Sequence, residues 1–337
     1  MTKSTDGRLD ILPGSLVDEL LAASRLEILD VVAKAYMMHE SGQSVNPDSY
    51  FLRFPEKPAS RLIALPSYLG GAVGLIGLKW VSSFPSNVQS GRPRAAATLM
   101  LNDYETGYPI ALLEGAGISA ARTAASAALA AKHLGVASEG TIAFVGAGVI
   151  ARTIVDYIAA VGLSFSSAVV SDLDAESASH LADHIWKRLE VEAAAASTQA
   201  ACEADLVVLA TNAAQPHVDP AYIPRSGQLV LNISLRDLPP EVILRSNNVL
   251  DDVEHCLKAD TSPHLAEQRV GHRDFIHGTL GSYLSTPFPL DPTRGTIFSP
   301  FGLGILDVAV GEYIFRRGAN DERVISIPNF INATTRW

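Results

Sequence analysis

The sequence is poor in cysteine and in long apolar runs, and each shortage excludes a class of protein. Its only two cysteines, Cys202 and Cys256, stand far apart, which excludes a disulfide framework and the paired spacing of a structural zinc site. Apolar runs such as 124–131 are too short to cross a bilayer. No apolar stretch follows the charges of residues 1–10, so we expect no signal peptide and a cytoplasmic location.

Positive charge is also scarce. The 26 Lys and Arg residues face 36 Asp and Glu residues, a net charge of −10, and no consecutive basic block could neutralise a run of phosphates. We therefore expect neither nucleic acid nor a membrane as a partner. With 337 residues, 47% of them hydrophobic, the chain is long enough for about two domains with cores of their own.

The first 120 residues or so have the pattern of a mixed helix and sheet domain. Residues 17–39 carry apolar side chains at helical spacing and are followed by a Ser-Gly stop, which predicts one amphipathic helix. Strands are predicted at 61–66, 74–81 and 96–102, separated by Gly and Pro punctuation, so a sheet of hairpin-connected strands is the simplest arrangement. A further helix is predicted at 304–317.

From residue 118 the pattern changes to alternating helices and strands. An Ala-rich helix is predicted at 118–134, with Ser119 as its cap. Alternation of this kind indicates a parallel sheet wound by right-handed crossovers. The strands are expected at 141–145, 168–171, 206–210, 228–233 and 249–251, and the helices between them at 150–161 and 175–188. We place the domains at 1–122, completed by 308–337, and at 123–307.

A glycine-rich turn follows the apolar strand 141–145 and leads directly into a helix. Its sequence has the G-x-G-x-x-A form of a dinucleotide fingerprint: Gly146 permits the tight turn, Gly148 lets the backbone approach a pyrophosphate, and Ala151 allows close packing. An ordinary glycine turn between strand and helix is the less favoured alternative. The cofactor-binding candidates in this turn are Gly146, Ala147, Gly148, Val149 and Ile150.

An acid ends the next predicted strand, where the ribose of a dinucleotide is expected. Asp172 would accept hydrogen bonds from the ribose hydroxyls and repel a 2′-phosphate, which favours NAD over NADP. Asp174 is the less favoured holder of that role, and either acid could instead cap the following helix.

Polar residues follow two later strands of the predicted parallel sheet. Since ligands lie outside the carboxyl ends of such strands, Thr211, Asn212 and Ser234 are candidates for cofactor contact, although a polar exit into a loop explains Thr211 and Asn212 equally well. Asp237 is placed for acid or base chemistry near a nicotinamide, although an Asp in a loop is by default a turn residue.

Three basic residues stand in apolar surroundings in the first domain and its adjoining helix. Lys79, Arg53 and Arg122 are of the types that commonly hold a carboxylate, Arg through its two-pronged fork. For Arg53, an internal salt bridge or a surface position is favoured on sequence alone. His180 and His184 lie one helical turn apart without further ligands, so a solvated helix face is favoured over a metal site, and no metal is expected.

Four segments together resemble the ornithine cyclodeaminase/mu-crystallin family: 101–109, 118–127, 146–148 and 302–309. The resemblance runs over nearly the whole chain. It implies an α/β protein with a Rossmann-type NAD domain and an α+β domain for substrate binding and dimerisation. It also implies an NAD-dependent oxidoreductase acting on a CH–NH bond of an amino acid, working as a homodimer.

The resemblance assigns roles to residues of this chain. Lys79 and Arg122 match positions that bind the substrate α-carboxylate, and Arg53 matches a third. Thr123 and the turn at 146–148 match contacts to the cofactor phosphates. Asp172 matches the ribose acid and Asp237 the catalytic aspartate, with Lys79 also stabilising charge in the reaction.

Within the family, the segments 51–55, 77–87, 105–109 and 299–307 look most like the siderophore-pathway branch. That branch implies NAD-dependent cleavage of N-(1-amino-1-carboxy-2-ethyl)-glutamate to 2,3-diaminopropionate and 2-oxoglutarate. Ornithine cyclodeaminases carry a Glu where this chain has Ile63, and Pro-Gly-Lys where it has Leu-Pro-Pro after Asp237, which argues against cyclisation. The alternatives are a cyclodeaminase for ornithine or lysine, an imine reductase or alanine dehydrogenase, and a mu-crystallin-like protein that binds NAD(P)H and a ligand without turnover.

Overall fold

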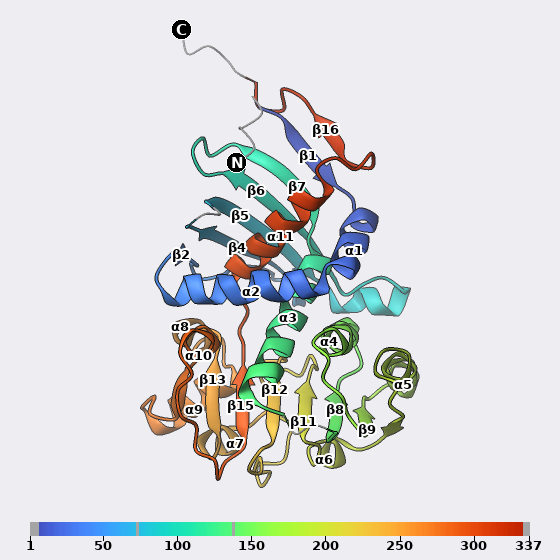
Figure 1. Cartoon of the computed structure of the whole chain (residues 1–337), viewed down its shortest axis with the longest axis vertical. Helices are drawn as coiled ribbons and strands as arrows, with labels where there is room; N and C mark the ends of the chain where they lie inside the picture. Colours follow the sequence, from blue (N-terminus) through green and yellow to red (C-terminus); the bar gives the residue numbers. More distant parts are fainter. Residues whose placement is uncertain (1–6, 72–73, 137–138, 333–337) are drawn as a thin grey trace. The chain divides into compact units, whose positions relative to one another are not determined.

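The computed structural model describes residues 7–71, 74–136 and 139–332 as an α/β protein that divides into two compact units (Figure 1). The first unit is Met1–Arg122 with Leu303–Trp337, and the second is Thr123–Gly302. The boundary between the second unit and the C-terminal part of the first unit therefore lies between residues 302 and 303. This differs from the boundary expected at 307, which would cut a helix that begins at Gly304. Residues 1–6, part of the segment from which we inferred that a signal peptide is lacking, lie outside the described residues.

The first unit is built on a mostly antiparallel sheet in the order β16-β1-β7-β6-β5-β4-β2, with β3 paired to β4 and β1 parallel to β7. The three strands predicted from the sequence correspond to β4, β5 and β6. The strands are β1 Leu9–Leu12, β2 Ser44–Val45, β3 Tyr50–Phe54, β4 Lys57–Leu69, β5 Leu75–Ser83, β6 Ala95–Asp103, β7 Pro109–Glu114 and β16 Ile325–Ile327.

The single helix expected at 17–39 is two helices, which corrects the prediction. α1 (Gly14–Ala23) ends and α2 (Arg25–Glu40) begins at the buried Ser24, whose φ of −128° and ψ of 28° are not helical. The apolar periodicity continues through the break because both helices face the same core, so the pattern could not locate it. The unit also contains η1 (Pro85–Ser90) and α11 (Gly304–Gly318).

Helix α11 packs closely on the sheet. A Cβ on Gly77 of β5 would lie 2.5 Å from Val308 Cγ2 of α11, so only glycine allows this approach. Alternate residues of β5 point to the opposite face of the sheet, and there Ile76 and Leu78 are half-buried and Trp80 is 39% exposed.

In the described part of the second unit, eight parallel strands form one sheet in the order β10-β9-β8-β11-β12-β15-β13-β14 (Figure 1). The strand order reverses beside β8, which is the switch point of a doubly wound sheet. This is the predicted Rossmann-type fold. The strands are β8 Thr141–Val145, β9 Ser167–Ser171, β10 Ala193–Ala195, β11 Leu206–Leu209, β12 Leu229–Asn232, β13 Asn247–Leu250, β14 Ile276–Thr279 and β15 Thr296–Ser299.

Helices flank this sheet, and the longest, α3, starts in the first unit. They are α3 Ala116–Leu134, α4 Val149–Ala160, α5 Ala175–Leu189, α6 Thr198–Ala201, α7 Pro240–Leu244, α8 Val253–Cys256, α9 Ser262–Val270 and α10 Leu280–Ser285. Among the helices that the structure describes, none has the length and apolar character needed to cross a membrane.

Two helix caps refine the sequence analysis. Ser119 lies inside α3 rather than at its start, and the Glu114 carboxylate accepts hydrogen bonds from the N–H groups of Ala116 (2.7 Å) and Gly117 (3.0 Å) instead. Glu114 stands two residues before the helix, and its side chain reaches forward to the first two N–H groups of α3. Asp174 caps α5 by accepting from Ser177 N at 3.2 Å.

Candidate active site

The predicted glycine turn connects β8 to α4 and has the geometry of a phosphate-binding turn. Gly146 has a φ of +93°, and a Cβ there would lie 2.5 Å from the carbonyl oxygen of Ala210 after β11, so no other residue fits. Its N–H donates to Ser171 O at 2.8 Å, which ties the turn to the end of β9.

The start of α4 offers space and unsatisfied donors for an anion. Gly148 is its N-cap residue, with no side-chain hydrogen bond to the helix, and a Cβ on Gly148 would meet no described atom within 4 Å. Ala151 is fully buried, and Val149 and Ile150 form the first turn with their N–H groups not bonded within the helix. These residues fit the pyrophosphate of a dinucleotide, which a helix N-terminus stabilises by its positive end.

The structure brings Asp172 to this turn. Its Oδ2 accepts from Ala147 N at 2.6 Å, and its Oδ1 accepts from Asp174 N at 2.8 Å. The carboxylate is thus fixed at the end of β9 beside the phosphate-binding turn, the position expected for contact with a ribose.

A second group of predicted residues gathers beyond β11 and β12 around the buried carboxylate of Asp237. Thr211 Oγ1 donates to Asp237 Oδ1 at 2.7 Å, and Ser234 Oγ donates to Oδ2 at 2.5 Å. His217 Nε2 lies 3.4 Å from Oδ1. Asn212 is exposed beside Thr211. The second unit thus joins three predicted residues, Thr211, Ser234 and Asp237, into one cluster.

The first unit holds a cluster of opposite character, in which two cations share one buried acid. Lys79 Nζ donates to Asp307 Oδ2 at 2.7 Å and to Ser119 Oγ at 3.0 Å. Arg122 Nε lies 3.5 Å from Asp307 Oδ1. The side chains of Lys79 and Asp307 are only 3% and 0% exposed. With Lys79 protonated, the three charged side chains carry a net charge of +1.

Burial makes the charge of Lys79 costly. The pKa of Lys79 is lowered from 10.5 to about 8, mainly because burial disfavours the charged form; Asp307 opposes this effect and the positive charge of Arg122 adds to it. The ammonium group of Lys79 therefore loses its proton at a pH that is only slightly above neutral.

Arg53 is not brought to this cluster. It is exposed on β3 opposite Arg61 of β4, which pairs with Ser83, and its guanidinium lies 5.4 Å from the centre of the Phe51 ring. Ser83 is four residues along β5 from Lys79. The register of the sheet therefore separates Arg53 from Lys79. Thr123 is half-buried on α3, as the first residue of the second unit.

Sequence reasoning did not single out Asp307 or His217. Asp307 lies within a segment that carries the family resemblance, and an acid among the apolar residues of the first turns of a helix was a usable signal because it needs a buried partner. His217 is a lone histidine in a loop, a pattern that carries no such signal.

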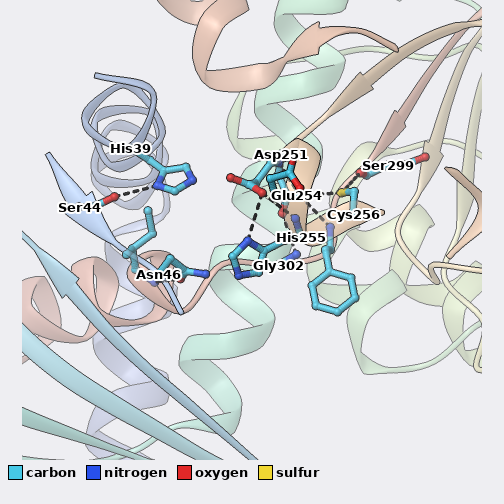
Figure 2. Close-up of polar contacts among 12 residues, drawn as sticks. His39, Ser44, Asn46, Asp251, Glu254, His255, Cys256, Ser299 and Gly302 are labelled. Atoms are coloured by element: carbon cyan, nitrogen blue, oxygen red, sulfur yellow. Dashed lines mark hydrogen bonds and ion pairs between the residues drawn. The ribbon is translucent and has the colours of Figure 1, made fainter. Parts of the chain in front are cut away.

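A further buried acid, Asp251, follows β13 in the second unit (Figure 2). Asp251 accepts from Phe301 N (2.9 Å), Gly302 N (2.7 Å) and Cys256 Sγ (3.0 Å), and burial raises its pKa. Burial also raises the pKa of the Cys256 thiol, so this cysteine remains protonated. These hydrogen bonds hold Phe301 and Gly302, the last residues of the second unit, against Asp251.

In the part of the chain that the structure describes, no three His, Cys, Asp or Glu side chains gather in a way that could hold a metal ion. His184 Nε2 instead pairs with Asp156 at 3.1 Å between α5 and α4.

Comparison with known proteins gives one consistent result. Residues 11–322 match the family model described as ornithine cyclodeaminase/mu-crystallin family. The chain is 28% identical over 301 residues to N-((2S)-2-amino-2-carboxyethyl)-L-glutamate dehydrogenase of Staphylococcus aureus, covering 86% of this chain and 89% of that protein. It is 26% identical over 316 residues to alanine dehydrogenase of Archaeoglobus fulgidus, covering 90% and 94%. The structure of Thermococcus litoralis Delta(1)-pyrroline-2-carboxylate reductase in complex with NADH and L-proline matches with a TM-score of 0.84 and 26% identity, covering 92% and 97%.

Proposed function

This chain belongs to the ornithine cyclodeaminase/mu-crystallin family, and we propose that it oxidises N-((2S)-2-amino-2-carboxyethyl)-L-glutamate with NAD, releasing 2,3-diaminopropionate and 2-oxoglutarate. The chain is an NAD-dependent oxidoreductase that acts on a carbon–nitrogen bond of an amino acid. The particular substrate, among those on which members of the family act, is what we propose here for this chain.

The observation that carries the proposal is the sharing of Asp307 by Lys79 and Arg122. Two cations meet in this largely buried cluster, and the carboxylate of an amino acid is the kind of anion that such a pair of cations binds. Arg122 provides the planar fork that binds a carboxylate through two parallel hydrogen bonds. We therefore assign Lys79 and Arg122 to the α-carboxylate of the substrate.

The glycine turn holds the cofactor in this proposal. The N–H groups at the start of α4 would bind the pyrophosphate, Asp172 would bind the ribose, and Thr211, Asn212, Ser234 and Thr123 would supply further contacts. When bound, NAD would serve as the acceptor of a hydride from the glutamate Cα, so that the amine becomes an imine.

Asp237 is the acid and base of the proposed reaction. It helps water add to the imine, and the carbon–nitrogen bond then breaks to give the two products. General acid or base help of this kind contributes roughly 10²–10⁴-fold in rate. Its hydrogen bonds to Thr211 and Ser234 fix the carboxylate at the ends of β11 and β12, where the doubly wound sheet binds its ligand.

The environment of Ile63 favours this reaction over cyclisation. In the sheet, Ile63 of β4 pairs with Phe51 of β3 and Val81 of β5, so this position offers no carboxylate for a distal substrate amine. An alanine dehydrogenase activity is the second candidate, because the Archaeoglobus relative covers 90% of the chain and an amino acid with one carboxylate also fits Lys79 and Arg122.

We also propose that the chain is a homodimer joined through the open face of the first sheet. Leu78 and Trp80 of β5 and Met100 of β6 are apolar side chains on that face, and a second copy would cover them. Both cysteines are free, which fits the reducing cytoplasm that we propose as its location. The released diaminopropionate would enter siderophore or peptide natural-product assembly.

The experiment is to follow NADH absorbance with purified protein, NAD and the proposed substrate, with ornithine, lysine and alanine as comparison substrates. The proposal expects NADH and 2-oxoglutarate in equal amounts, and loss of most of this turnover in Asp237→Asn. Loss of ammonia from ornithine or lysine without net NADH would instead establish a cyclodeaminase. Binding of NADH without turnover of any substrate would establish a mu-crystallin-like binding protein.

A further inference from the structure

His217 lies against the carboxylate of Asp237 in a geometry that the backbone fixes. Its Nε2 is 3.4 Å from Asp237 Oδ1. The backbone N–H groups of His217 and Val218 both donate to the carbonyl oxygen of Asp237 at 3.1 Å. The loop after β11 is therefore tied to Asp237 itself, so the distance between imidazole and carboxylate does not depend on a flexible side chain alone.

Asp237 is shielded from bulk solvent. It is 0% exposed, and the hydroxyl protons of Thr211 and Ser234 are donated to its two oxygens. Thr211 Oγ1 in turn accepts from Ala213 N at 3.1 Å. These hydroxyls hold the carboxylate in place, and the His217 imidazole is in contact with it.

His217 connects Asp237 to a half-open cavity of about 520 Å³. The His217 side chain is 34% exposed and forms part of the cavity wall. Burial raises the pKa of the Cys202 thiol to about 12 and raises the pKa of the Tyr222 hydroxyl, so both keep their protons at neutral pH. The charged groups that line the same cavity are Glu203, Asp219 and Arg225.

The proposed reaction needs such an exit for a proton. A hydride leaves the substrate carbon for NAD, water supplies the carbonyl oxygen, and the carbon–nitrogen bond breaks to leave a protonated amine. Starting from a protonated substrate amine and NAD⁺, the products are the keto acid, the protonated amine, NADH and one proton. A buried base that takes up this proton must pass it on before the next turnover.

We propose that His217 is the positioning residue through which Asp237 exchanges its proton with solvent. The inference rests on the proposed role of Asp237. Nε2 faces the carboxylate, and the second ring nitrogen of the imidazole completes the exchange with water in the cavity.

The test uses His217→Gln, which keeps a hydrogen-bond donor but does not titrate, and His217→Ala, which leaves room for a small base. We expect each to lower kcat about tenfold or more without changing the affinity for NADH. We also expect the dependence of kcat on pH to change in His217→Gln, and added imidazole to restore part of the activity of His217→Ala. His184→Gln is the matched control, because His184 also pairs with an aspartate in the same unit.

The outcomes separate this inference from the proposed function. If the wild-type protein does not oxidise the proposed substrate, the proposed function fails, and the variants are then compared on the amino acid that it does oxidise. If wild-type turnover is normal and His217→Gln keeps both the kcat and the pH profile, the exchange role of His217 is wrong. Lost activity that imidazole does not restore, with an unchanged pH profile, would show a purely structural role and would also overturn it.

Discussion

Lys79 Nζ donates a hydrogen bond of 2.7 Å to Asp307 Oδ2, although 228 residues separate them in the sequence. One lies on a central strand of the first sheet and the other on the first turn of α11, and both are shielded from water. The pair thus joins the two ends of the chain that make up the first unit, and it forms the centre of the proposed carboxylate site.

Asp307→Asn is expected to destabilise the protein by about 3–5 kcal/mol, because it leaves Lys79 buried without its acidic partner. Chemical denaturation with the linear extrapolation gives this value. Glu19→Gln breaks an exposed pair with Arg323 and serves as the control, with a much smaller expected change. Equal changes in the two variants would contradict the buried character of the Lys79 pair.

Activity is expected to depend on the charge of Lys79. Because burial lowers its pKa to about 8, kcat/KM is expected to fall as the pH rises through about 8 and the carboxylate loses a cation. Lys79→Arg keeps its charge and is expected to lose this fall, at some cost in activity. Measurement of kcat/KM from pH 6 to 10 for the wild-type protein and for Lys79→Arg tests this prediction. Identical pH profiles would show that Lys79 does not bind the substrate carboxylate.

The lowered pKa of Lys79 also makes the stability of the protein depend on pH, and here the expected change is a rise with pH, where activity is expected to fall. Between about pH 8 and 10.5 the unfolded chain keeps a proton on Lys79 that the folded chain has lost. The contribution of this group to the free energy of unfolding therefore rises with pH across that window. Denaturation of wild-type and Lys79→Met at pH 7.5 and 10 measures the difference, and a contribution that falls with pH would have the wrong sign.

Gly148→Ala is expected to reduce NADH affinity about tenfold while leaving folding intact. Its φ of −76° suits alanine, and the added Cβ meets no described atom, so it would occupy only the space assigned to the pyrophosphate. Fluorescence titration gives the affinity and thermal denaturation gives the stability. Gly146→Ala is the comparison, and it is expected to unfold more easily because of its φ of +93°. Unchanged affinity in Gly148→Ala would place the phosphates elsewhere.

Asp172→Ser is expected to raise the ratio of kcat/KM for NADP to that for NAD about tenfold or more, because a carboxylate repels a 2′-phosphate. Asp174→Ser provides the control, since Asp174 caps α5 and a serine can replace it. Steady-state rates with both cofactors decide the matter. A ratio that changes with Asp174 and not with Asp172 would reverse the two assignments.

Trp80→Lys is expected to convert the proposed dimer to monomers, since it places a charge in the centre of the open sheet face. Sedimentation velocity measures the mass. Leu26→Lys changes an apolar side chain that is 59% exposed on α2 and is expected to leave the mass unchanged. A wild-type monomer would refute the dimer proposal directly.

The family and the Rossmann-type fold could be predicted from the sequence because their signals are local. The strand predicted at 141–145 is found with the same bounds as β8, and the other predicted elements of the second unit lie within about two residues of their positions. What the pattern could not show was β15, which enters the sheet between β12 and β13 although it follows both in sequence. Pairing of that kind depends on contacts between distant segments.

By itself, the sequence determined the turn at 146–148 and the alternation of strand and helix, because backbone sterics and hydrophobic periodicity act over a few residues. Tertiary structure alone decided which groups meet. It brought Asp307 to Lys79 and Arg122, brought His217 to Asp237, and left Arg53 apart from the Lys79 cluster. The physical reason is that a buried charge is stable only with a partner, and the partner is chosen by packing rather than by nearness in the chain.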